Sequence, residues 1–168
     1  MVDELELRTR LAANKARLRR KDAAERMQSL PAFVAGIADR FAIHWYDDVY
    51  KSACDWVKAS VPLYGPYADR HHFGDDDGRG LEDSLARFVA HHGLGGWAEI
   101  FGGFDSHDVA ISVETAAIAA FVPKLRTDYW SAFCDTVIVS RSRAWCLMVH
   151  HEGDLFYWAF EAPDQVPA

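Results

Sequence analysis

Three runs near the end of the chain decide its fold: Thr136-Val137-Ile138-Val139-Ser140, Ala144-Trp145-Cys146-Leu147-Met148-Val149-His150 and Leu155-Phe156-Tyr157-Trp158-Ala159-Phe160. All three are rich in β-branched and aromatic residues, which suit the pleated surface of a sheet. Short polar segments, residues 141–143 and 151–154, separate the runs, and this spacing is typical of hairpin turns. We therefore predict an antiparallel three-stranded meander.

The segments before the meander mix extended and helical patterns. Residues 97–101 and 108–113 alternate weakly between apolar and polar side chains, which predicts two short strands. Residues 81–92 begin with acidic side chains and end before Gly93, which predicts a helix, and residues 112–125 predict another helix on the sheet. Residues 67–80 show no regular pattern, so we expect a surface loop there.

The beginning of the chain favours helices. Residues 3–30 are strong helix formers with leucines at 7, 11 and 18, which predicts an exposed amphipathic helix. Ser29-Leu30-Pro31 marks a second helix start, and apolar residues at intervals of three and four predict that this helix continues to about Tyr50, with residues 54–61 as an extension. We predict one α+β domain over residues 1–168, with N-terminal helices covering one face of a mostly antiparallel sheet.

Composition indicates one ordinary folded domain. The chain has 168 residues, of which 50% are hydrophobic and 26% charged, and this excludes a disordered or collagen-like chain. The acidic residues 1–6 do not resemble a secretory signal, and the longest apolar run, residues 116–122, is shorter than the ~18 residues of a membrane span. We expect a cytoplasmic protein with no membrane partner. Cys54, Cys134 and Cys146 are widely spaced, so we expect buried thiols rather than disulfides.

The net charge of −7 hides an asymmetry between the first helix and the rest. Residues 1–30 contain eight basic and five acidic residues, whereas residues 31–168 contain ten basic and twenty acidic ones, a net charge of −10. The main body should therefore repel nucleic acid and attract a basic partner. The basic cluster at residues 17–21 is interpreted as a solvated helix face, and we predict no nucleic-acid partner.

Adjacent histidines occur three times, as His71-His72, His91-His92 and His150-His151. Neighbours on a strand point to opposite faces and neighbours on a helix diverge by roughly 100°, so such pairs favour structural or exposed histidines over metal ligands. The run Asp75-Asp76-Asp77 suggests a calcium loop, but Arg79 and Ala86 would then occupy ligand positions, which excludes an EF-hand. An irregular site of His71, His72 and Asp75–Asp77 stays open; otherwise we predict no metal and no cofactor.

Motifs of the common enzyme classes are missing from the sequence, which contains no GxSxG, HExxH, GxGxxG or phosphate-binding loop. An active site assembled from distant residues leaves no such motif and stays an open alternative. Six tryptophans and six tyrosines favour a contact surface, because these residues dominate interface energies, although a core role explains them equally well. We predict that acidic and histidine side chains bind a partner: Asp75, Asp76, Asp77, Glu82, Asp83, Asp105, Asp108, His150, His151, Glu152 and Asp154.

A resemblance supports this interpretation. Asp135-Thr136-Val137-Ile138-Val139-Ser140, Ala144-Trp145 and His150-His151-Glu152-Gly153-Asp154-Leu155-Phe156 resemble the closing hairpin of bacterial toxin-immunity proteins, the partners of contact-dependent inhibition and related polymorphic toxins. The likeness covers about the last quarter of the chain. It implies a role, the occlusion of a toxin domain by charge and shape complementarity, and it assigns no residues.

The sequence thus predicts a cytoplasmic immunity protein that is not an enzyme and that neutralises a basic toxin by stoichiometric binding. Two alternatives stay open. One is a metal-dependent hydrolase that uses His71, His72 and Asp75–Asp77. The other is an oligomeric regulatory module in which the N-terminal helix pairs with its own copy.

Overall fold

The computed structural model describes residues 6–11, 13–14, 17–18, 21, 28–45, 47–62, 65–74, 79–102, 109–128 and 135–161. The described residues between 6 and 21 are helical, and Leu7, Leu11 and Leu18 are each more than half exposed. The elements that follow are α2 (Leu30–Ala35), β1 (Phe41–Trp45), α3 (Asp48–Ser60), β2 (Asp69–His72), α4 (Arg79–His91), β3 (Trp97–Gly102), β4 (Val109–Glu114), the 3-10 turn η1 (Thr115–Ala117), α5 (Ile118–Asp128), β5 (Thr136–Ser140), β6 (Trp145–Val149) and β7 (Asp154–Ala159).

The strands form one seven-stranded sheet in the order β1-β4-β3-β5-β6-β7-β2. Every neighbouring pair is antiparallel. Strands β5, β6 and β7 pair consecutively, which is the meander that the sequence predicts. The α+β class is therefore confirmed, and β2 and β1 are the two edges of the sheet.

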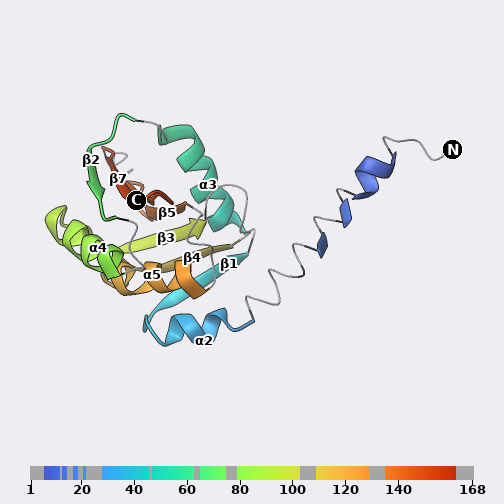
Figure 1. The fold of residues 1–168 in the computed structure, drawn as a ribbon, viewed down its shortest axis with the longest axis horizontal. Helices are drawn as coiled ribbons and strands as arrows, with labels where there is room; N and C mark the ends of the chain where they lie inside the picture. Colours follow the sequence, from blue (N-terminus) through green and yellow to red (C-terminus); the bar gives the residue numbers. More distant parts are fainter. Residues whose placement is uncertain are drawn as a thin grey trace, which may run out of the picture.

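Helices cover both faces of the sheet, whereas the sequence predicted cover on one face only. Helices α4 and α5 lie on one face and α3 lies on the other (Figure 1). Leucines of α4 and Phe121 of α5 pack with Ile138 and Leu147, and Val57 of α3 packs with Val137 and Met148. Side chains of a strand alternate between the faces, and β5 and β6 are buried at every residue. Both faces are therefore apolar and both need a layer of helix.

Two segments differ from the sequence prediction. The helix expected to run from Pro31 to about Tyr50 ends at Ala35, and Phe41–Trp45 is strand β1. Apolar residues at 41, 43 and 45 satisfy a period of two as well as part of a helical period, and pairing with β4 decides between them. Within the loop expected at residues 67–80, Asp69–His72 pairs with β7 as an edge strand.

Helix α4 and strands β3 and β4 are confirmed: α4 ends at His91, before Gly93 with a φ of 60°, and the two strands lie where the patterns place them. The helix predicted over residues 112–125 begins only at Ile118, because residues 112–114 belong to β4 and Thr115–Ala117 form η1. The helix predicted over residues 3–30 lies only partly within the described residues. Cys54 and Cys146 are buried free thiols, and burial raises the pKa of Cys146 well above its usual range; Cys134 lies outside the described residues. Within the described part of the chain, none of the helices has the length and apolar character that a membrane span requires.

Candidate functional site

The antiparallel register brings several separate segments of the chain to one end of the sheet. Gly102 pairs with Thr136, Thr136 with Val149, and Val149 with Leu155, which in turn faces His71 on β2. The ends of β1, β3 and β6 and the beginnings of β4, β5 and β7 therefore lie together. The connections that leave the strands here are neighbours in space although they are far apart in sequence.

Five connections start or finish at described residues of this end, and in sequence they are residues 46–47, 73–78, 103–108, 129–135 and 150–153. In sequence they contain no Lys or Arg and eight carboxylates: Asp47, Asp75, Asp76, Asp77, Asp105, Asp108, Asp135 and Glu152. At the opposite end, residues 36–40, 61–68, 92–96 and 141–144 contain three arginines and one aspartate. The opposite end also carries Asp69, Glu114 and Glu161 on its strand ends and after β7, so it is mixed in charge, whereas the first set of connections is acidic in sequence. We name the first end the acidic end.

The first turn of α4 also belongs to the acidic end. Ser84 contacts His71 at 3.2 Å, and His92, just after α4, contacts Asp69 at 3.0 Å, so α4 runs antiparallel to β2. Glu82 and Asp83 are both exposed there. The β6–β7 turn is close by, because the Phe73 amide donates to the carbonyl of Gly153, and a Cβ built on Gly153 would lie 2.7 Å from the oxygen of Gly74.

The structure therefore gathers most of the predicted partner-binding residues that it describes. Glu82, Asp83, His151 and Glu152 are exposed at the acidic end, and His150 is half-buried beside them. Residues Asp75, Asp76, Asp77, Asp105 and Asp108 lie outside the described residues, but the described chain on both sides of them is at this end.

Asp154 differs from its prediction, because it is buried rather than displayed. Its side chain is 7% exposed and accepts hydrogen bonds from Arg70 Nη2 at 2.9 Å and His72 Nδ1 at 3.2 Å. Burial acts to raise the pKa of Asp154, but these hydrogen bonds and charges outweigh it and hold the pKa below its usual value. Asp154 therefore holds the edge strand β2 to β7 and does not belong to the contact surface.

The proposed metal pair His71-His72 does not converge. His71 points towards α4 and contacts Ser84, whereas His72 points to the other face and contacts Asp154. This follows from the alternation of side chains on β2, as the sequence analysis expects of adjacent strand residues. The two histidines therefore cannot hold one metal ion between them in this arrangement.

Two other histidine pairs do come together with a carboxylate. Asp69, His91 and His92 form one group and Asp135, His150 and His151 another, and in each the three ligand atoms lie within 4.8 Å of one another. Neither group is predicted by the sequence, because the geometry of continuous strands and helices separates the rings of adjacent histidines, and both of these pairs lie where such an element ends. The position of His91-His92 directly before the helix-ending Gly93 is the signal that could have indicated the first group.

A serine, a histidine and an aspartate also line up beneath α3. His44 Nδ1 lies 2.7 Å from Asp47 Oδ2, and His44 Nε2 lies 3.0 Å from Ser112 Oγ, the order of contacts in a serine-hydrolase triad. Ser112 is completely buried, however, and Arg141 Nη2 donates to its hydroxyl at 3.2 Å. A substrate cannot reach this hydroxyl, so the group joins β1 and β4 to the start of α3.

Asp47 has a second role at the beginning of α3, where its carboxylate accepts a hydrogen bond from the Tyr50 amide at 2.9 Å. Burial acts to raise the pKa of Asp47, but the bonds from Tyr50 and His44 are together stronger and hold the pKa below its usual value. The carboxylate is thus a helix cap that stays ionised.

The most buried charge in the sheet is Glu99, in the middle of β3 and only 1% exposed. Arg143 Nη1 lies 2.8 Å from one carboxylate oxygen and Arg141 Nε lies 3.1 Å from the other. Both arginines come from the β5–β6 turn at the opposite end of the sheet. The two arginines therefore neutralise Glu99 and do not reduce the negative charge of the acidic end.

No protein family, characterised protein or solved structure was found to match the chain. Its function therefore has to be inferred from the arrangement of its own residues.

We expect Arg143→Met to lower the free energy of unfolding by about 3 kcal/mol, because it leaves the buried Glu99 short of its closer partner. The matched variant Arg141→Met should cost about 1 kcal/mol or less, since the Arg141 side chain is 52% exposed against 17% for Arg143. Urea denaturation measures both. Adding Glu99→Gln to Arg143→Met should restore part of the loss, and equal costs for the two arginine variants would contradict this account.

Asp154→Asn should destabilise the protein in a pH-dependent way. Because the pKa of Asp154 is lowered on folding, its contribution is complete above the unfolded pKa of about 3.9 and is lost as the pH falls through the folded value. The difference in unfolding free energy between wild type and variant, about 1–3 kcal/mol at neutral pH, should therefore shrink below about pH 4. The exposed control Glu152→Gln should change little at either pH, and a constant difference for Asp154→Asn would refute the prediction.

Proposed function

We propose that this chain is a cytoplasmic immunity protein that binds a basic toxin domain with one-to-one stoichiometry and covers its active site. The observation that carries the proposal is the acidic end, where five connections contain eight carboxylates and no Lys or Arg. A surface of one sign accelerates capture of an oppositely charged partner and disfavours partners of like charge.

The composition of the same connections supports a protein partner rather than a small cation. In sequence they contain five aromatic residues besides Phe73, which packs against the core; these five lie outside the described residues and are Tyr46, Phe104, Tyr129, Trp130 and Phe133. Aromatic anchors surrounded by charge are typical of protein interfaces with high affinity. The resemblance to immunity proteins also falls partly here, because it includes Asp135 and the turn from His150 to Asp154.

Two arginines near this end, Arg70 and Arg126, are held by other groups, although Lys51 of α3 and Lys124 of α5 are exposed on the adjoining helices. Arg70 is held by Asp154, and Arg126 of α5 is 6% exposed and donates to Thr136 and the carbonyl of Val149. Arg141 and Arg143 are held at the far end by Glu99. The exposed carboxylates of Glu82, Asp83 and Glu152 can contact a basic partner, which would bury roughly 1,600 Å² in an interface of standard size.

The test is to purify this chain with the toxin domain encoded beside it and to measure their association rate at low and high salt. Wild type should form a one-to-one complex and protect cells that express the toxin. The double variant Glu82→Lys/Glu152→Lys changes two exposed residues of the acidic end. It should slow association by about ten-fold or more at low salt, and by less at high salt.

The matched control is Asp39→Lys/Glu161→Lys, which makes the same change of charge at two exposed residues of the opposite end. It should leave the association rate within about two-fold of wild type. Charges at the far end of the molecule lie away from the proposed interface, and salt screens their effect on the partner. The proposal fails if no complex forms, or if the control slows association as much as the acidic-end variant does.

A further inference from the structure

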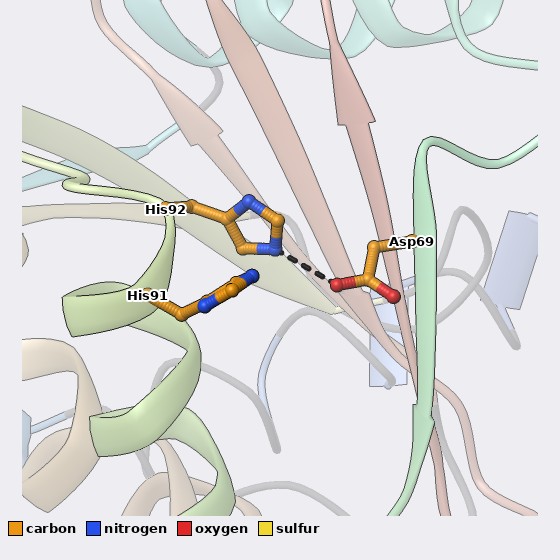
Figure 2. Close-up of side chains that lie close together, drawn as sticks. All are labelled: Asp69, His91 and His92. Atoms are coloured by element: carbon orange, nitrogen blue, oxygen red, sulfur yellow. Dashed lines mark hydrogen bonds and ion pairs between the residues drawn. The ribbon is translucent and has the colours of Figure 1, made fainter.

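The end of α4 brings two histidines and an aspartate together beside the edge strand, at the end of the sheet opposite the acidic end. His92 Nε2 lies 3.0 Å from Asp69 Oδ2, and the nearest ligand atoms of Asp69, His91 and His92 all lie within 4.8 Å of one another (Figure 2). We propose that these three side chains bind a divalent transition-metal ion, with zinc as the best match.

The local structure explains why these adjacent histidines converge when His71 and His72 do not. His91 is the last residue of α4 and His92 follows it, before the chain turns at Gly93 with a φ of 60°. The two rings are 4.8 Å apart and nearly perpendicular, at 82°. In Figure 2 both rings lie on the side of the helix end that faces Asp69 on β2.

Two of the three ligands are already oriented by neighbouring groups. The Arg70 amide donates to Asp69 Oδ1 at 2.7 Å, which leaves Oδ2 directed at His92. The ring of His92 stacks on Tyr157 at 4.1 Å and packs against Phe88 at 4.8 Å. Contacts that fix the orientation of a carboxylate and an imidazole are the outer-sphere support that protein metal sites use.

The donor set determines the class of metal. Two imidazole nitrogens and one carboxylate oxygen suit zinc and similar transition metals, whereas calcium and magnesium prefer oxygen ligands only. In a tetrahedral zinc site with bonds of about 2.0–2.2 Å, the ligand atoms lie about 3.3–3.6 Å apart. His92 Nε2 and Asp69 Oδ2, at 3.0 Å, are already close to this separation. The nitrogen of His91, which lies within 4.8 Å of both, must move by up to about 1.5 Å, and its exposed side chain can do so by rotation.

Three protein ligands leave one position of a tetrahedral zinc ion for water or another small ligand. A cavity of about 290 Å³ adjoins the group, and Asp69 and His91 line it together with His71, Ser84 and Arg87. The remaining position therefore has room for a ligand that can exchange with solvent.

The second group, Asp135, His150 and His151, is less suited to one ion. In the first group the carboxylate uses separate oxygens, Oδ1 for the Arg70 amide and Oδ2 for His92, whereas in this group one oxygen takes both bonds. Asp135 Oδ1 already accepts hydrogen bonds from the backbone amide and the ring of His151, at 3.0 and 2.9 Å. This group serves as the internal comparison in the test.

The test is calorimetric titration of zinc chloride into the full chain after dialysis against a chelator, with cobalt absorption as a second readout of imidazole ligation. Wild type should bind one ion per chain at this site. His91→Ala and Asp69→Asn should each weaken that binding by more than about 100-fold, because even outer-sphere changes commonly cost about 10- to 100-fold. His150→Ala/His151→Ala should leave it unchanged.

Circular dichroism checks that the variants fold. Both should do so, because His91 is exposed and asparagine has nearly the same shape as aspartate. His92 is not substituted, because its ring packs on Tyr157 and its loss could disturb the fold. The proposal is overturned if wild type binds no zinc, or if binding survives His91→Ala and Asp69→Asn but is lost in His150→Ala/His151→Ala. Wild type could also bind a second zinc ion that only His150→Ala/His151→Ala removes. This result supports the assignment, because the loss of the first ion in His91→Ala and Asp69→Asn still identifies its site. Toxin binding should not change in His91→Ala, so failure of either proposal is recognised separately.

Discussion

A carboxylate buried in the middle of the sheet is the constraint on which much of this structure depends. Glu99 is 1% exposed, and a charge in that position is stable only with close, well-aligned partners. Arg141 and Arg143 meet this need from the β5–β6 turn, and Arg143 adopts a φ of 61° to do so. The same guanidinium lies over Trp56 and reaches Ser52 of α3, so the pairing also helps to fix the helix that covers this face.

This pairing has a consequence for the distribution of charge. At one end of the sheet, Arg141 and Arg143 form ion pairs with Glu99. The guanidinium groups of Arg141 and Arg40 also lie over the ring of Trp97, at 5.0 and 5.3 Å from its centre. The carboxylates of the other end have no comparable set of cations in their connections. The antiparallel topology thus brings the described ends of connections that are acidic in sequence to one end of the sheet, as the proposed recognition of a basic protein requires.

The three histidine pairs show how local backbone geometry decides what identical dipeptides can do. On β2 the rings point to opposite faces, and each finds its own partner, Ser84 for His71 and Asp154 for His72. At the end of α4 and in the β6–β7 turn the backbone leaves regular geometry, and both rings can approach one carboxylate. Adjacent histidines therefore have to be judged by the element that carries them, and most carefully where that element ends.

The sequence by itself determined the class of the fold, the meander, helix α4 and the strands β3 and β4, because hydrophobic period, β-branched residues and glycine stops act locally. It also selected Glu82, Asp83 and Glu152 as contact residues, and all three are exposed. Only the tertiary structure decided that Phe41–Trp45 is a strand and that Asp69–His72 forms an edge, since pairing with β4 and β7 outweighs an ambiguous local pattern. The tertiary structure alone also buries Asp154, pairs Glu99 with Arg143 and brings Asp69 to His91 and His92. Each of these contacts joins segments that are far apart in the chain, and the sequence does not show that such segments are close in space.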